Sequence, residues 1–386
     1  MLEGGIAACA VASGSAAVMV TVLALAQAGD NIISSVNVHG GTYHLFKALA
    51  KQIGVECRFI KTYHPDDYVA AIDGRTKFIF FESISNPQYA VPDFEALAKV
   101  AHEKGLPLIC DNTFGCAGYF CRPIDYGVDI VIHSATKWIG GHGTTVGGVI
   151  VDGGTFNWGI HGNRFRQFHD KQTRLWEKFG RRAFAVRCQW EVLRDVGCTL
   201  SASAAQQLLI GLESLSVRCE RHAENTRMLS DWLCTQPQVA WVSYLGHKSH
   251  AYHENAKRYL RRGFGSVISF GAKGGKQASL QVCDALKMVI TTGNLGDSKT
   301  LVVHPWSTTH EQFDEKEREA VGVTDDLIRL SVGIEHIDDI KKDFSQALAQ
   351  LANPKDSNLG PSTAQLLVQS AINRGLYGEE PYALSN

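Results

Sequence analysis

The sequence has no long run of charge of one sign and no apolar stretch long enough to cross a bilayer. It carries 38 basic and 39 acidic residues among 386, and neither kind gathers into a tail. Charge this balanced gives no sign of nucleic acid or an anionic membrane as a partner. The most apolar stretch, 16–28, is shorter than the ~20 residues of a spanning helix. We expect a core helix there.

The spacing of a disulfide framework is also missing. The ten cysteines include no CxxC pair and follow no secretory signal pattern, and some stand in apolar company, such as Cys110 and Cys283. This usage is typical of reduced thiols in a cytoplasmic protein. The regularly spaced His247, His250 and His253 lie among polar residues that indicate a loop, so we expect no metal site.

What the chain does contain is a strand that leads to a lysine. The apolar run 128–133 is typical of a buried strand, and Ser134, Thr136, Lys137 and several glycines follow it. A lone lysine at a strand's end is most often a solvated surface charge. Here the two hydroxyls can hold an anion, and strand alternation predicts that Lys137 points the other way. An amine beside a phosphate site is what a Schiff-base site for pyridoxal phosphate requires.

Strand and helix patterns alternate before and around this point. The expected strands are 31–35, 56–60, 77–82, 107–110 and 128–133, and the expected helices are 44–54, 65–72 and 93–104. This alternation indicates an α/β fold with a parallel sheet and helices on both faces. Ligands of such sheets gather at the carboxyl ends of strands. Asn86, Asp111, Ser134 and Lys137 all fall there.

A second, smaller unit is expected in the rest of the chain. The pattern loosens over 152–189, and a strongly helical stretch, 200–233, follows. We expect a large cofactor-binding domain at 1–230 and a small α/β domain at 231–386. Its strands are predicted at 239–244, 266–270 and 327–332. The polar end, 354–386, is expected to wrap a neighbour or to be mobile.

The motif around the lysine is long enough to carry a resemblance. The string VDIVIHSATKWIGGHG at 128–143, continued by GGVIV at 147–151, resembles the cofactor-lysine motif of the Cys/Met-metabolism family of pyridoxal-phosphate enzymes. It looks most like the O-acetylhomoserine sulfhydrylase branch, and the likeness runs from residue 2 to about 344. The resemblance implies fold type I, with a mostly parallel seven-stranded sheet and a smaller C-terminal domain. It also implies a homotetramer built from active dimers.

Small residues at 12–17 open the first long helix, where unpaired N–H groups form a phosphate cradle. The resemblance implies that Gly14 and Ser15 bind the phosphate through their backbone, and that Ser134 and Thr136 add hydroxyls. Family members usually begin several dozen residues earlier, with an arm whose Tyr and Arg clasp the neighbouring subunit's phosphate. Either this sequence is a trimmed form or the protein lacks those two ligands.

The residues expected around the cofactor ring are Asp111, Asn86 and Lys137. As ordinary residues, an Asp at a strand end is a cap and an Asn before proline is a turn residue. The resemblance implies that Asp111 keeps the pyridine nitrogen protonated and that Asn86 bonds the ring hydroxyl. It also implies that Lys137 holds the cofactor covalently and shuttles protons.

The substrate is expected to meet Arg329, which stands in an apolar strand. Arginine is rarely buried unless it is paired, so an internal acid is the structural alternative. The resemblance implies a bidentate fork for the substrate's α-carboxylate, with Asn294 and Thr309 near that carboxylate.

Two residues depart from the family pattern. His39 stands where the family usually has a tyrosine that stacks on the cofactor and helps proton movement. Imidazole can do both near neutral pH, so we expect His39 to be a cofactor-binding and catalytic residue. Trp306 stands where relatives usually carry a small residue. Its indole is expected to reshape the substrate pocket that admits the incoming nucleophile.

The resemblance implies a γ-replacement on O-acetyl-L-homoserine, in which acetate leaves and a nucleophile adds. Sulfide or a thiol is the default nucleophile. A carbon or nitrogen nucleophile, as in related fungal enzymes of specialised metabolism, is the alternative that His39 and Trp306 favour. A γ-lyase giving a 2-oxoacid and ammonia also stays open, although Gly41 stands where methionine-degrading lyases carry Cys. So does a non-catalytic paralogue.

Overall fold

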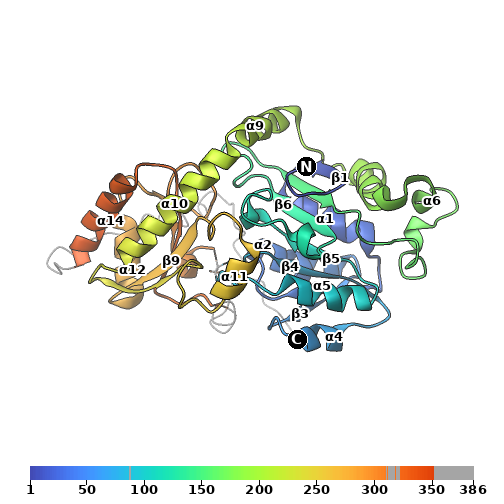
Figure 1. Cartoon of the computed structure of the whole chain (residues 1–386), viewed down its shortest axis with the longest axis horizontal. Helices are drawn as coiled ribbons and strands as arrows, with labels where there is room; N and C mark the ends of the chain where they lie inside the picture. The colour runs from blue at the N-terminus through green and yellow to red at the C-terminus, as the bar shows by residue number, and fades with distance from the viewer. Residues whose placement is uncertain (87, 310, 312–317, 319–321, 352–386) are drawn as a thin grey trace.

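The chain folds around two sheets, which lie side by side (Figure 1). The computed structural model describes residues 1–86, 88–309, 311, 318 and 322–351. The first sheet is built from strands before residue 153 and the second from strands after residue 238. The predicted wrapping or mobile end, 354–386, lies outside the described residues.

Seven strands form the large sheet, in the order β1-β7-β6-β5-β4-β2-β3. Six of them run in the same direction, and β7 runs antiparallel to both of its neighbours, β6 and β1. The mostly parallel sheet is therefore confirmed. The strands are β1 (Ala7–Val11), β2 (Asn31–Ser35), β3 (Glu56–Ile60), β4 (Thr76–Glu82), β5 (Leu108–Asp111), β6 (Ile130–Ser134) and β7 (Gly148–Asp152). The sequence pattern does not predict β1, because AACAV has only one β-branched residue.

Helices cover both faces of this sheet, and the strands show why. Along β6, Ile130 and Ile132 enter one hydrophobic core while Val131 enters the other, because successive side chains of a strand point to opposite faces. Helix α1 (Gly14–Leu25) packs into the first core and α5 (Phe94–Glu103) into the second. Both begin on a side-chain cap, from Ser13 and Asp93.

Shorter helices complete the large unit. The predicted helix 44–54 is found as α2 (Gly40–His44), a π-helical turn (45–49) and α3 (Ala50–Gln52), and α4 (Pro65–Ala71) follows. The loose stretch after β7 holds α6 (Leu175–Phe179), α7 (Ala183–Arg187) and α8 (Arg194–Val196).

The second sheet has five strands in the order β10-β11-β12-β9-β8. They are β8 (Val239–Ser243), β9 (Val267–Ala272), β10 (Ile290–Thr291), β11 (Leu301–Val303) and β12 (Leu327–Ser331). The sequence predicts β8, β9 and β12 but misses β10 and β11, which are too short to show a period. Helices α12 (Gly275–Ala285) and α14 (Ile337–Leu351) pack on this sheet, whereas α11 (His253–Tyr259) contributes Ala256 and Tyr259 to a core of the large unit.

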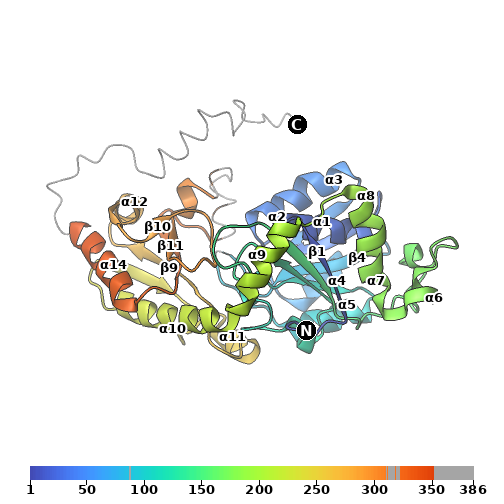
Figure 2. The same cartoon turned by 90° about the horizontal axis from the view of Figure 1, so that it is seen from above.

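Two helices connect the units. The predicted stretch 200–233 forms α9 (Ala202–Glu213) and α10 (Leu215–Leu233), separated at Ser214, and they run from the large unit along one edge of the small one (Figure 2). Leu215 of α10 belongs to a core of the large unit, and Leu233 belongs to the core of the small unit. The predicted boundary at 230 falls inside α10, and the division into two domains stays a prediction.

No helix in the described part of the chain combines the length and the apolar character of a membrane span.

We expect Phe94→Ala to destabilise the large unit. Phe94 is fully buried and stacks on Tyr259 of α11, with 4.3 Å between ring centroids. Removing a buried phenyl ring leaves a cavity and lowers the free energy of unfolding by ~3–5 kcal/mol. Chemical denaturation measures the loss. The control is Trp190→Ala, because Trp190 is 55% exposed; a loss of equal size in both variants would contradict the prediction.

Candidate active site

A cavity of about 220 Å³ lies where β4, β5 and β6 end and α1 begins. It is at the carboxyl ends of parallel strands, the usual ligand position in such sheets. All eight residues predicted to bind the cofactor line it, namely Gly14, Ser15, His39, Asn86, Asp111, Ser134, Thr136 and Lys137.

One end of the cavity is suited to an anion. Gly14 and Ser15 occupy the first turn of α1, where the N–H groups have no preceding helical carbonyl to bond. A Cβ built on Gly14 would come within 2.7 Å of Ser134 Cβ, so glycine permits the helix start to approach the end of β6. The hydroxyls of Ser134 and Thr136 face the same cavity. These donors fit a phosphate.

The cavity wall also presents a partly buried carboxylate, that of Asp111. Asp111 Oδ1 accepts hydrogen bonds from Thr113, from its N–H at 2.9 Å and its hydroxyl at 2.6 Å. Thr113 in turn accepts a 2.8 Å bond from the N–H of Ser134, which fixes Asp111 relative to the end of β6. Burial raises the pKa of Asp111 above its ordinary value, against the opposing effects of Thr113 and His133. A protonated ring nitrogen is the kind of partner this carboxylate fits.

Lys137 faces the cavity together with Ser134 and Thr136. The prediction that it points the other way is wrong, because β6 ends at Ser134 and the chain turns after it. The alternation of side chains ends with the strand. The Nζ of Lys137 donates to Asn294 Oδ1 at 2.5 Å. Burial, and then the charge of Arg329, lower the pKa of Lys137 to about 8.

His39 lies at the N-terminus of α2 and lines the cavity near Lys137. Solvent reaches its ring, yet the surrounding protein displaces much of its hydration. That effect, with the charges of Lys137 and Arg329, lowers the pKa of His39 to about 4. The imidazole is therefore neutral near pH 7. A neutral imidazole can still accept a proton, so the predicted roles of His39 in proton transfer and in stacking both stay predictions.

Sequence reasoning missed two residues, Glu82 and Thr113, which also line the cavity. Glu82 is paired with Asp111 across β4 and β5, and its Oε1 accepts the N–H of His39 at 2.5 Å. Burial, and then the charge of Asp111, raise the pKa of Glu82 well above its ordinary value. The signal was available, since Glu82 ends a predicted strand just as Asp111 does.

Arg329 of β12 is 3% exposed and bonds mainly to backbone. Its Nη2 donates to the carbonyls of Gly293 at 2.9 Å and Asn294 at 3.1 Å, and its Nη1 lies 3.5 Å from Asn86 Oδ1. Within the described residues Arg329 has no ion pair with an acid, and its buried Nε has no hydrogen-bond partner. The internal-acid alternative is thus not found there, and a carboxylate ligand would supply the missing partner.

The other two predicted substrate residues lie differently. Thr309 is close to Gly293, because a Cβ built on Gly293 would come within 3.2 Å of Thr309 Cγ2. Trp306 is not among the residues that line the cavity. Its ring packs under the guanidinium of Arg318, 4.6 Å from ring centroid to Cζ. Asn294 and Arg329 do not line this cavity either, but they contact its lining residues Lys137 and Asn86. The indole of Trp306 contacts Arg318, and its role in the substrate pocket stays a prediction.

A lysine of lowered pKa, an anion-binding helix start and a partly buried carboxylate surround one cavity at the edge of a mostly parallel sheet. Together they define a pyridoxal-phosphate enzyme of fold type I, and the residues fit the cofactor at its phosphate, its ring nitrogen and its aldehyde. The family model described as Cys/Met metabolism PLP-dependent enzyme matches residues 1–349, and the chain belongs to this family.

Similar proteins agree with this assignment. The chain is 66% identical over 377 residues to the sulfhydrylase-like protein lolC1 of Epichloe uncinata, covering 98% of this chain and 80% of that protein. It is 50% identical to the homocysteine/cysteine synthase of Saccharomyces cerevisiae, covering 90% and 81%. A putative O-acetylhomoserine (thiol)-lyase of Campylobacter jejuni, solved with a pyridoxyl-lysine monophosphate, superposes with a TM-score of 0.85 at 35% identity, covering 90% and 84%.

The contact between Lys137 and Asn294 generates a prediction about pH. Pyridoxal phosphate should load onto the apoenzyme with a rate that rises through a midpoint near the lysine pKa of about 8, because only the neutral amine attacks an aldehyde. Asn294→Asp adds a negative charge that favours the ammonium, so the midpoint should rise by roughly one unit or more. Asn294→Leu removes an acceptor, so the midpoint should fall.

Absorbance after mixing apoenzyme with pyridoxal phosphate measures these rates. The matched control is Asn157→Asp, which adds the same charge at an exposed position and should leave the midpoint unchanged. Shifts of the same sign in both Asn294 variants would show that the contact does not control the amine.

Proposed function

We propose that this chain catalyses a γ-replacement on O-acetyl-L-homoserine, in which the γ carbon loses acetate and gains a nucleophile. The observation that carries the proposal is the position of Lys137. Its amine faces the cofactor cavity and at the same time contacts Asn294, whose carbonyl is bonded by Arg329. One amine thus stands between the cofactor site and a buried cation suited to an α-carboxylate. The names of the yeast and Campylobacter relatives support the same substrate class.

The proposed roles follow from these positions. Bound pyridoxal phosphate supplies a ring that accepts electrons from the substrate's α carbon. Arg329 binds the α-carboxylate through its Nε and Nη1, which carry no strong internal partner among the described residues. Lys137 takes a proton from the α carbon and returns it, because its pKa of about 8 lies near the working pH. Asp111 holds a proton at the ring nitrogen by its negative charge.

Sulfide or a thiol is the first candidate for the nucleophile. Hydrosulfide is already an anion, so it needs no base to become reactive, whereas a thiol with an ordinary pKa of about 8.5 is ionised only in small part near neutral pH. His39 has a pKa of about 4 and is a weak base for activating an amine or an enolisable carbon compound. The low pKa of His39 therefore supports sulfur over the other nucleophiles.

A carbon or nitrogen nucleophile is the second candidate, and the observation that favours it is the position of the His39 ring, not its basicity. The ring lines the cavity in place of the family's usual tyrosine, so it changes the shape and the hydrogen bonding that an incoming molecule meets. Trp306 gives less support, because its indole packs on Arg318. The name of lolC1, sulfhydrylase-like, is compatible with either nucleophile.

The lyase alternative meets a steric objection at Gly41. A Cβ built on Gly41 would lie 2.8 Å from His39 Cε1 and 3.1 Å from its Nδ1. A cysteine at this position would have to displace the imidazole. His39 and Gly41 thus form a matched pair, which supports γ-replacement over the methionine-degrading branch.

A cytoplasmic homotetramer completes the proposal. All ten cysteines are free thiols, as is common in a reducing compartment. Leu209 and Ile210 of α9 and Val217 of α10 expose more than half of their surface, and aliphatic side chains on neighbouring helices suit a subunit contact.

The test supplies O-acetyl-L-homoserine with sulfide, thiols, amines and enolisable carbonyl compounds in turn, and identifies products by mass. We expect acetate release to match product formation and to be fastest with sulfide or a thiol. His39→Tyr should change the ranking of nucleophiles, because the ring lines the cavity. Trp306→Ala is the control and should leave the ranking unchanged.

Three outcomes would contradict the proposal. A 2-oxoacid and ammonia formed at the same rate without any nucleophile would identify a lyase. An absorbance spectrum with pyridoxal phosphate that does not change in Lys137→Ala would indicate a non-catalytic protein. A ranking that responds to Trp306→Ala but not to His39→Tyr would place the determinant outside the cavity.

A further inference from the structure

Arg218 of α10 is a buried cation that the site described above does not use. It is 4% exposed. Its Nη2 donates to the carbonyls of Trp138 at 2.9 Å and Gly211 at 2.7 Å, and its Nε donates to Ser214 Oγ at 3.0 Å. In the part of the chain that the structure describes, no acid forms an ion pair with it. A buried charge without a counter-ion is costly, so its presence calls for a specific role.

The group that Arg218 binds is the turn that carries Lys137. Trp138 is the next residue, and the turn closes with a 2.7 Å bond from the N–H of Gly141 to the carbonyl of Lys137. Gly141 has a φ of +73°, and a Cβ there would lie 2.1 Å from Arg218 Nη1. The guanidinium therefore fills the space against the turn. The Nη1 group is buried there without a hydrogen-bond partner among the described residues. The guanidinium thus packs closely against the turn although one of its donors is unsatisfied.

The same face of α10 holds the end of the strand that carries Arg329. His222 donates from Nδ1 to the carbonyl of Val332 at 2.6 Å. Asn225 donates to the carbonyls of Gly333 at 3.0 Å and Glu335 at 2.8 Å. Positions 218, 222 and 225 follow the spacing of one helix face. One rigid helix thus contacts the turn of Lys137 and the end of β12.

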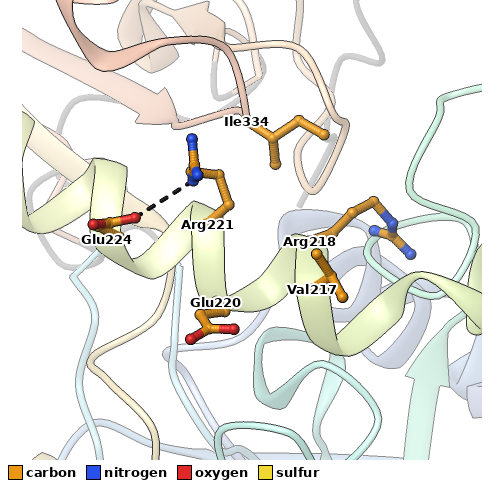
Figure 3. A pocket seen from close by; sticks show the side chains of 6 residues that line it. All are labelled: Val217, Arg218, Glu220, Arg221, Glu224 and Ile334. Carbon is orange, nitrogen blue, oxygen red and sulfur yellow. Dashed lines mark ion pairs between the residues drawn. The ribbon is translucent and has the colours of Figure 1, made fainter.

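A second arginine of α10 offers a contrast. Arg221 pairs with Glu224 at 3.4 Å, and both side chains are about half exposed. Figure 3 shows that Arg218 and Arg221 point in different directions from the helix, with Arg221 near Ile334. Arg218, Arg221 and Glu224 all contribute to the lining of the open groove on this side of α10. The difference lies in their partners, because the guanidinium of Arg218 donates to the carbonyl of Trp138 in the Lys137 turn, whereas that of Arg221 pairs with Glu224.

We propose that Arg218 is a positioning residue for the reaction, acting through the carbonyl of Trp138 to keep the amine of Lys137 within reach of Asn294 and the cofactor cavity. The inference rests on the proposed role of Lys137. Loss of the guanidinium fork releases the turn, and the amine then moves away from Asn294 and into better hydration. A displacement of ~1 Å is enough to slow a positioned reaction by up to 100-fold.

The test compares Arg218→Gln and Arg218→Lys with Arg221→Gln as the matched control. The first readout is the pH midpoint for loading pyridoxal phosphate onto the apoenzyme, which does not depend on the amino-acid substrate. It should rise in Arg218→Gln, because better hydration moves the pKa of Lys137 back toward its ordinary value. Arg218→Lys should lie between, since an ammonium can donate to Trp138 but cannot form the fork. Arg221→Gln should match the wild type.

The second readout is steady-state kinetics with O-acetyl-L-homoserine. We expect kcat of Arg218→Gln to fall by about 10- to 100-fold, with KM changed far less because the contacts of Arg329 are untouched. The two proposals can fail separately. If Arg218→Gln shifts the loading midpoint but the wild-type enzyme does not turn over O-acetyl-L-homoserine, the proposed function is contradicted and the positioning role is still supported.

The charged groups that face Lys137 must stay constant in this comparison. Arg218 forms no hydrogen bond or ion pair with any of them within the described residues, so its replacement does not remove a charge partner of the amine. The charged groups that face Lys137 are Arg329 on β12, His39 before α2, Glu82 at the end of β4 and Asp111 at the end of β5.

A folded Arg218→Gln with the wild-type midpoint and kcat would overturn the inference and leave Arg218 a purely structural residue. Should Arg218→Gln fail to fold, Arg218→Lys and Ser214→Ala decide the matter. Ser214→Ala removes only the partner of Nε and should shift the midpoint in the same direction by a smaller amount. Wild-type midpoints in both variants would equally refute the role.

Discussion

The short contact between Lys137 Nζ and Asn294 Oδ1 is the interaction on which the site depends. Lys137 belongs to the turn after β6, whereas Asn294 belongs to the loop between β10 and β11. The contact therefore joins the two units at the reacting amine. Burial and the nearby Arg329 disfavour its charge, and the amide oxygen favours it. The balance leaves an amine that can exchange a proton near neutral pH, as a catalytic acid and base must.

Much of this arrangement could be predicted from sequence, because apolar runs reveal strands and strands reveal where their ends meet. Asp111, Ser134 and Thr136 were found in this way and line one cavity. The direction of Lys137 could not be found, since alternation says nothing about a chain that turns after Ser134. The same reasoning from strand ends extends to Glu82, which ends its strand beside Asp111.

The position of Trp306 shows a different limit. Its ring packs against the guanidinium of Arg318, twelve residues later in the chain. No local sequence pattern predicts such a contact. His39 shows the same limit in its chemistry. Its residue type suggests a proton carrier, but two cations from other elements, Lys137 and Arg329, help to keep the ring neutral. The sequence was enough to predict that His39 is a functional residue. Its charge state could not be predicted, because it depends on residues that only the fold brings close.

The site combines two acidic and two basic side chains. Two carboxylates, Glu82 and Asp111, end adjacent strands of the large sheet, and burial raises the pKa of both. The basic side chains are Lys137 and Arg329, whose pKa values are lowered by burial. Among the described residues none of the four forms an ion pair, and an amino acid or a phosphate-bearing cationic ring would supply the counter-charges. A bound ligand would therefore bring the counter-charges, and in the described part of the chain the buried Nε of Arg329 has no hydrogen-bond partner.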